Sequence, residues 1–199
     1  MKNINYCLAA LAVFIITGCN SKPDYKSWTQ YKGSDENIHY SALTQVDTTN
    51  VKQLQVAWTY HTRDADTVFH SQIQCNPIAI DGVLYGTSPK MKLFAIDAAT
   101  GKEKWQFNPF DSLAKDKRMF FVLNNCRGLM YWADGDDKRI YYTAGPYLYS
   151  VNAETGSLVK AFGNGGKIDL HEGLGSDEKD LFVTATSPPI AYKDIMIMR

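Results

Sequence analysis

The acidic run at residues 134–137 is one place in this chain where residue types and spacing suggest chemistry. Asp134, Asp136 and Asp137 supply carboxylates, and carboxylate oxygens are ligands that Ca²⁺ prefers. A calcium loop of the EF-hand type needs a glutamate at its twelfth position, where this chain has Gly145. The run also stands between two stretches that favour strands, so we interpret it as a hairpin turn.

Histidine, glycine and cysteine patterns point to no other familiar site. The four histidines lack metal-ligand spacing, and the glycine-rich run at residues 163–166 opens no helix, so it is not a phosphate loop. Cys75 and Cys126 are the cysteines that lie beyond the N-terminal segment 1–19. An oxidising compartment permits a disulfide between them, but one pair does not make a disulfide scaffold, and their pairing stays open.

A repeated turn indicates the elements that must position any site. The segment 95–105 returns in weaker form around Asn152, which takes the place of Asp97 in the second copy. Asp or Asn can accept backbone N–H groups two or three residues on, and the glycine that ends each turn can take positive φ. Pro77 and Pro189 are separated by twice the same period, so a second landmark supports the repeat.

Short apolar and β-branched runs flank these turns and predict strands. The predicted strands are residues 83–86, 93–96, 104–107, 140–143, 148–151, 190–192 and 195–198. Hairpins that repeat about every 56 residues favour an all-β fold, a β-propeller, over a sandwich. The chain holds about three such blades, whereas propellers close with about four to eight, so we expect it to be the N-terminal part of a longer protein.

The N-terminal segment 1–19 predicts export. Lys2 precedes the apolar run from Leu8 to Ile16, which is too short to cross a bilayer, since a spanning helix needs about 20 residues. The four residues ending at Cys19 resemble a bacterial lipobox, so we expect lipidation of Cys19, with plain secretion as the alternative. The expected organisation is a signal peptide at residues 1–19, a tether at 20–27 and a propeller portion at 28–199.

The charge balance argues against nucleic acid as a partner. The chain has 21 Lys and Arg and 21 Asp and Glu, so its formal net charge is zero. Proteins that bind the phosphate backbone carry a basic patch or stripe. We therefore expect no nucleic-acid partner.

The residues around the repeated turns resemble a known family. The pattern Ala-x-Asp-x-x-Thr-Gly-x-x-x-Trp at residues 95–105 is similar to the tryptophan-docking repeat of the pyrroloquinoline quinone (PQQ)-dependent dehydrogenases. Segments that follow in that family's order are residues 28–35, 40–46, 50–60, 126–132, 162–170 and 186–190. The resemblance is greatest to the glucose dehydrogenase branch. It implies an eight-bladed propeller, facing the periplasm, that oxidises a sugar or alcohol and passes electrons to a quinone or cytochrome.

The resemblance implies four cofactor-binding residues. Arg127 matches the arginine of the family's Cys-Arg-Gly motif, and its permanently charged guanidinium can bind a carboxylate or quinone oxygen of PQQ. Gln74 stands where the family often has a cofactor-contacting glutamate, and Thr186 and Ser187 stand where it has hydroxyl contacts. The structural alternatives are a salt bridge for Arg127 and ordinary strand or turn positions for the other three.

Some positions depart from the family's patterns. Leu123 replaces a histidine found in some membrane glucose dehydrogenases, and the adjacent cysteine pair of the methanol dehydrogenases is absent. Lys160 stands where the repeat would place tryptophan. The family's catalytic aspartate and Ca²⁺ ligands belong to later blades, so we expect them beyond Arg199, and we expect this chain alone to be inactive.

A second function class shares part of this sequence signature. Scaffold lipoproteins of outer-membrane barrel assembly also combine propeller repeats with a lipobox, but they hold no cofactor. They do not share the context around Arg127, the segment from Thr186 to Pro189, or the opening at residues 28–35. These segments favour the dehydrogenase over the scaffold.

Overall fold

The computed structural model describes residues 25–34, 36–68, 71–111, 125–175, 181–192 and 195–198. The predicted signal peptide, the lipobox with Cys19, and Leu123 lie outside these residues. The described part is all-β except for the 3-10 turn η1 (Val51–Gln53). None of its helices is long and apolar enough to cross a membrane.

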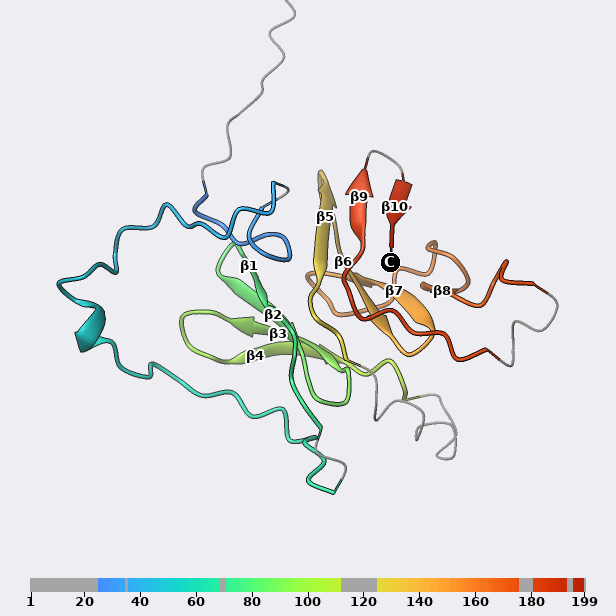
Figure 1. Cartoon of the computed structure of the whole chain (residues 1–199), viewed down its shortest axis with the longest axis horizontal. Coiled ribbons are helices and arrows are strands. Elements are labelled where there is room, and N and C mark those ends of the chain that lie inside the picture. The colour runs from blue at the N-terminus through green and yellow to red at the C-terminus, as the bar shows by residue number, and fades with distance from the viewer. Residues whose placement is uncertain are drawn as a thin grey trace, which may run out of the picture.

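Three antiparallel sheets follow one another along the chain (Figure 1). Blade 1 contains β1 (Ile78–Ile80), β2 (Val83–Thr87), β3 (Leu93–Asp97) and β4 (Glu103–Phe107). Blade 2 contains β5 (Met130–Asp134), β6 (Asp137–Ala144), β7 (Tyr147–Asn152) and β8 (Lys167–Asp169). The third sheet is a hairpin of β9 (Ile190–Tyr192) and β10 (Ile195–Ile197). In each sheet every strand pairs with the next one in sequence, which is the up-and-down order of propeller blades.

The predicted strands are confirmed. Each predicted run falls on β2, β3, β4, β6, β7, β9 or β10, whereas β1, β5 and β8 were not expected as strands. The acidic run is a hairpin turn, as predicted, because Asp134 pairs with Asp137 and Gly135 between them has φ +57°.

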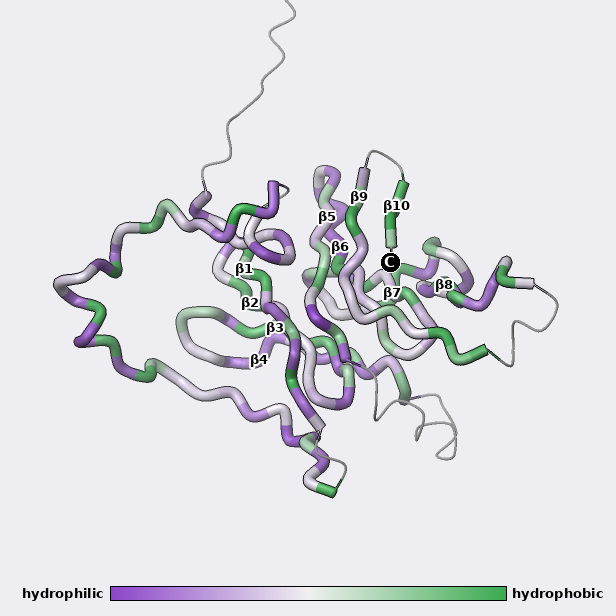
Figure 2. Tube along the Cα trace, in the orientation of Figure 1, coloured by the Kyte–Doolittle hydropathy of each residue, from purple (hydrophilic) through white to green (hydrophobic). Residues whose placement is uncertain are grey.

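Blade 2 is buried on both faces, and the period of two in β6 shows how. Ile140 and Tyr142 belong to the core shared with blade 1, whereas Tyr141 between them belongs to a second cluster that includes Met196 of β10. Met196 of β10 packs against blade 2, whereas the Ile195 and Ile197 side chains on the same strand are exposed in the described part of the chain. Figure 2 shows β10 as a strongly apolar segment.

The repeated turn forms as the sequence predicts. Asp97 Oδ1 accepts hydrogen bonds from the Thr100 backbone N at 2.8 Å and from Thr100 Oγ1 at 2.7 Å, and Gly101 has φ +72°. Asn152 Oδ1 makes the same two bonds with Thr155, at 2.9 and 3.0 Å. Asn can replace Asp here because each turn needs only one side-chain acceptor.

Candidate functional site

The chain segments that precede β1, β5 and β9 lie side by side. The Asn76 backbone N donates to Arg127 O at 2.9 Å, and its side-chain Nδ2 donates to the same oxygen at 3.1 Å. The Arg127 backbone N in turn donates to Thr186 O at 2.8 Å. Asn76 and Gly128 pair in the parallel sense. The backbone thus runs in one ladder from blade 1 through blade 2 to the third sheet.

This ladder follows from the fold. Each blade begins with its first strand, and the first strands of successive blades run in the same direction around a propeller's centre. Residues just before β1, β5 and β9 therefore meet at one end of the three sheets, although a whole blade separates each from the next in sequence. The structure brings Arg127 and Thr186 into direct backbone contact, and Ser187 follows Thr186 at a half-buried position.

Arg127 has a fixed backbone and an exposed side chain. Its N–H and C=O are both paired with neighbouring blades, whereas the side chain reaches into solvent. Within the described part of the chain the guanidinium forms no ion pair. The salt bridge considered as a structural role for Arg127 is thus not made there. A guanidinium in this state presents paired N–H donors that can bind a planar anion.

Gln74 has a different arrangement. Its side chain is half-buried, and its Nε2 donates to Gln72 Oε1 at 3.0 Å, within its own segment. Gln74 stands two residues before Asn76, so it lies near the ladder without a hydrogen bond to Arg127 or Thr186 in the described residues. An amide has both donors and an acceptor, so this side chain can exchange Gln72 for a ligand.

Two thiols lie next to the ladder residues. Cys75, which is half-buried, and Cys126, which is buried, are both free cysteines. Cys126 Sγ donates to Gly128 O at 3.0 Å. Burial raises the pKa of Cys75, and burial together with the nearby Cys75 raises the pKa of Cys126 to about 12. The thiols therefore stay protonated at neutral pH, and Cys126 supports the Cys-Arg-Gly segment as a hydrogen-bond donor.

Sequence reasoning missed Asn76 and assigned no role to Tyr31. Asn76 joins the segment before β1 to the segment before β5, because its backbone N and its side-chain Nδ2 both donate to Arg127 O. In the sequence, only its position before the repeated Pro77 could have indicated this role. Tyr31 lies on Gly128, next to Arg127, although the two residues are far apart in the sequence. No periodic pattern reports a contact of that kind.

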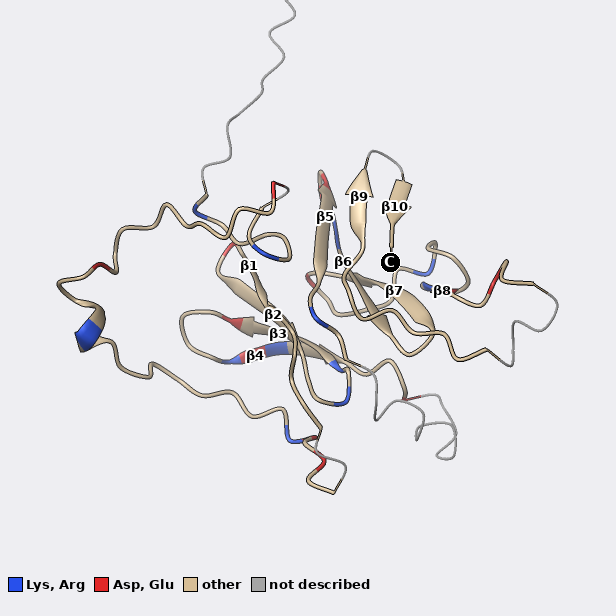
Figure 3. Ribbon diagram, viewed as in Figure 1, with Lys and Arg blue, Asp and Glu red and all other residues tan. Residues whose placement is uncertain are grey.

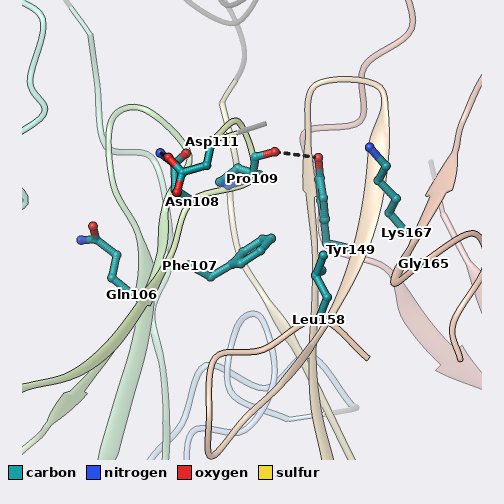
Figure 4. A pocket seen from close by; sticks show the side chains of 9 residues that line it. All are labelled: Gln106, Phe107, Asn108, Pro109, Asp111, Tyr149, Leu158, Gly165 and Lys167. Atoms are coloured by element: carbon teal, nitrogen blue, oxygen red, sulfur yellow. Dashed lines mark hydrogen bonds between the residues drawn. The ribbon is translucent and has the colours of Figure 1, made fainter. Parts of the chain in front are cut away.

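A cavity of about 450 Å³ lies between the blades, away from the ladder (Figure 4). Its walls include Phe107 from β4, Tyr149 from β7 and Lys167 from β8. The Tyr149 hydroxyl donates to Pro109 O at 3.3 Å, which joins the two blades beside the cavity. None of Gln74, Arg127, Thr186 and Ser187 lines it, so it is a separate feature from the predicted cofactor site.

Acidic residues are dispersed over the loops, the turns and the ends of strands (Figure 3). In the described residues no group of three or more His, Cys, Asp or Glu side chains could hold a metal ion. Asp137, from the acidic run, pairs with Arg139 instead, and hydrogen bonds from that guanidinium lower the pKa of Asp137.

Comparison with known proteins identifies the family. Residues 28–199 match the family described as PQQ: glucose/ethanol/alcohol dehydrogenase, beta-propeller domain. The chain is 35% identical over 167 residues to quinoprotein glucose dehydrogenase A of Acinetobacter calcoaceticus, and the match covers 73% of this chain and 20% of the relative. It is 28% identical over 190 residues to the glycerol dehydrogenase large subunit of Gluconobacter oxydans (strain 621H), and this match covers 90% of this chain and 25% of the relative.

A solved structure gives the same fold. The quinohemoprotein alcohol dehydrogenase from Comamonas testosteroni superposes with a TM-score of 0.66 at 24% identity, over 88% of this chain and 23% of that one. The chain thus spans about a quarter of the length of the relatives it matches. These matches do not favour the barrel-assembly scaffold. With a family match from residue 28 to residue 199, the chain belongs to the β-propeller family of PQQ-dependent glucose, ethanol and alcohol dehydrogenases.

Proposed function

We propose that this protein is a PQQ-dependent dehydrogenase that oxidises a sugar or alcohol, glucose-like by resemblance, and passes the electrons to a quinone or cytochrome. The observation that carries the proposal is the backbone ladder that holds Arg127 beside Thr186 at one end of the blades. It brings the backbone of Arg127, an exposed cation in the segment before β5, next to the segment before β9 that contains Thr186 and Ser187.

The residues at this place fit PQQ, which is a planar ortho-quinone with three carboxylates. Arg127 offers paired N–H donors for a carboxylate or a quinone oxygen, and Thr186 and Ser187 offer hydroxyl donors. Asn76 already uses its amide on Arg127 O, so its role is to hold the arginine backbone. Gln74 would add an amide after leaving Gln72. When bound, PQQ would supply the quinone that accepts hydride, and Ca²⁺ would polarise that quinone.

The rigid backbone explains how Arg127 would select its ligand. Its peptide groups are fixed on both sides, so only the side-chain torsions must be ordered when an anion binds. Ordering fewer bonds lowers the entropic cost of binding, which is the advantage of preorganisation. Arg127 and the two hydroxyls would then hold and orient the cofactor.

Location is a second part of the proposal. The lipobox resemblance at residues 16–19 suggests that Cys19 carries a lipid and that the protein is an exported, periplasm-facing or outer-membrane lipoprotein. Labelling cells with an alkyne-tagged fatty acid tests this. The label should appear on the wild type and be lost in Cys19→Ser but kept in Cys7→Ser. Equal labelling of wild type and Cys19→Ser would contradict lipidation.

Titration of the purified apoprotein with PQQ tests the cofactor assignment. We expect saturable quenching of tryptophan fluorescence by PQQ. Phenanthrenequinone, an ortho-quinone without carboxylates, should have a dissociation constant at least about tenfold higher than that of PQQ. Dye reduction with glucose, ethanol and glycerol, in the presence of Ca²⁺ and PQQ, tests the expectation that this chain alone is inactive, and measurable reduction would contradict that expectation. A protein that binds neither quinone would contradict the proposal and favour the scaffold function.

A further inference from the structure

The ring of Tyr31 occupies the space where a side chain of residue 128 would lie. A Cβ placed on Gly128 would come 2.6 Å from Tyr31 Cδ2 and 3.3 Å from Tyr31 Cγ, and the shorter of these is closer than carbon atoms can pack. The Pro188 ring lies on the same residue, with Cγ 3.4 Å from that position. Gly128 is buried, and its φ is not in the left-handed region, so the glycine is required here by the close approach of Tyr31.

Tyr31 is itself held in place. Earlier in the same segment, the Trp28 N donates to Ala79 O at 3.2 Å, and Ala79 N donates to Trp28 O at 2.8 Å, which fastens the segment to β1. A turn closed by the Gly33 N and Gln30 O, at 2.9 Å, contains Tyr31 at a half-buried position. The ring is therefore fixed relative to blade 1 before it touches blade 2.

The contact falls on the residue next to Arg127. The Arg127 carbonyl accepts from Asn76, and the Arg127 N–H donates to Thr186 O. The Cys126 thiol donates to Gly128 O, the carbonyl of the next residue. The face of Gly128 toward the N-terminal segment is covered by Tyr31. Without the ring, the Arg127–Gly128 peptide would keep its hydrogen bonds to Asn76 but would lose its packing partner on this face, and a shift of the peptide would change the direction of the Arg127 side chain.

We propose that Tyr31 is a positioning residue of the cofactor site, which holds the Arg127–Gly128 peptide so that the guanidinium points toward its anionic ligand. This inference rests on the proposed function. It assigns part of the site to the N-terminal segment, which precedes the whole of blade 1 in the chain. A purely structural contact would affect stability alone, whereas a positioning contact also changes the affinity for PQQ.

The test uses the full chain and two readouts, the PQQ dissociation constant and the urea unfolding midpoint. Tyr31→Ala should weaken PQQ binding by about threefold to tenfold, whereas Tyr31→Phe, which keeps the ring, should stay within about twofold of the wild type. Tyr40→Ala is the matched control, because Tyr40 packs edge-on against Tyr25 in the same N-terminal region. It should leave PQQ binding unchanged. If Tyr31→Ala does not fold, Tyr31→Leu replaces it with the same criterion.

A double-mutant cycle tests the contact itself. Gly128→Ala should destabilise the wild type and weaken PQQ binding, but in the Tyr31→Ala background the new methyl group has room, so both effects should shrink. Additive effects on unfolding would show that the ring does not fill this space and would overturn the inference.

The PQQ affinities of the wild type and of Tyr31→Ala distinguish the positioning role from the proposed function. Wild-type PQQ binding that is unchanged in Tyr31→Ala overturns the positioning role and leaves the proposed function intact. Absence of PQQ binding by the wild type overturns the proposed function and the positioning role together.

Discussion

The indole Nε1 of Trp105, in blade 1, donates a hydrogen bond to Ala153 O in blade 2 at 3.1 Å. The Tyr85 hydroxyl donates to the same carbonyl at 3.2 Å. The indole ring also lies on Gly156, since a Cβ there would come 2.7 Å from Trp105 Cδ2. Trp58 makes the equivalent bond to Ala98 O, at 3.0 Å, one blade earlier. The repeated turn is thus a docking surface for the tryptophan of the preceding unit.

The docking glycine should be sensitive to substitution for a reason beyond its dihedral angle. Gly156→Ala places a methyl group against the indole, whereas Gly82, with a similar φ of +75°, has nothing within 4 Å of its Cβ position. Both variants carry the cost of positive φ, of about 1 kcal/mol, and Gly156→Ala should lose about 1–3 kcal/mol more through overpacking. Urea unfolding of the two variants measures the difference. Equal losses would show that the indole does not pack on the turn.

The aspartate of the first turn should make stability depend on acid. Hydrogen bonds from the Thr100 side chain and backbone favour the charged carboxylate and lower the pKa of Asp97 from its ordinary value. A depressed pKa contributes stability that is present above the unfolded pKa and lost as pH falls through the folded value. Asp97→Asn keeps an acceptor but not the charge, so it should be less stable than the wild type at pH 7 and should lose less stability on acidification.

The second turn offers the reciprocal substitution. Asn152 makes the same bonds without a charge, so Asn152→Asp should add acid sensitivity to the protein. Urea midpoints measured from pH 7 down to about pH 3 for the three proteins test both changes. An unchanged acid slope in Asp97→Asn, together with no added slope in Asn152→Asp, would contradict this account of the turn.

Much of the fold could be predicted from local sequence. The Asp97 turn and the alternating runs around it predicted β2, β3, β4, β6 and β7, because turn chemistry and a period of two act within a few residues. β1 and β8 have three residues each, and β8 contains two charged residues, so neither has enough apolar alternation to stand out. The fold was predictable where the signal is local and repeated.

The candidate site was predictable only in part. Arg127 and Thr186 came from a resemblance, and their backbone contact depends on two blades lying side by side, which no local pattern encodes. Gln74 was predicted with them but bonds to Gln72, because a neutral amide can pair with any nearby amide. Tyr31 depends on a single long-range contact with Gly128.

Cys75 and Cys126 should be unreactive thiols. Burial raises the pKa of Cys126 to about 12 and also raises the pKa of Cys75, so the thiolate that reacts with disulfide reagents is scarce at neutral pH. In a variant with Cys7 and Cys19 replaced by Ser, a colorimetric disulfide reagent should find almost no thiol in the native protein. It should find two thiols in urea without reductant. No thiol in urea would show a Cys75–Cys126 disulfide and contradict the free pair.

The most direct measurement of the central claim is the PQQ dissociation constant of Arg127→Gln beside Arg139→Gln. Arg139 is a matched control because its guanidinium is already paired with Asp137 on β6. Loss of a charge-assisted bond should weaken PQQ binding by about tenfold or more in Arg127→Gln, and Arg139→Gln should bind within about twofold of the wild type. Equal affinity in the wild type and Arg127→Gln would contradict the assignment of Arg127 to the cofactor.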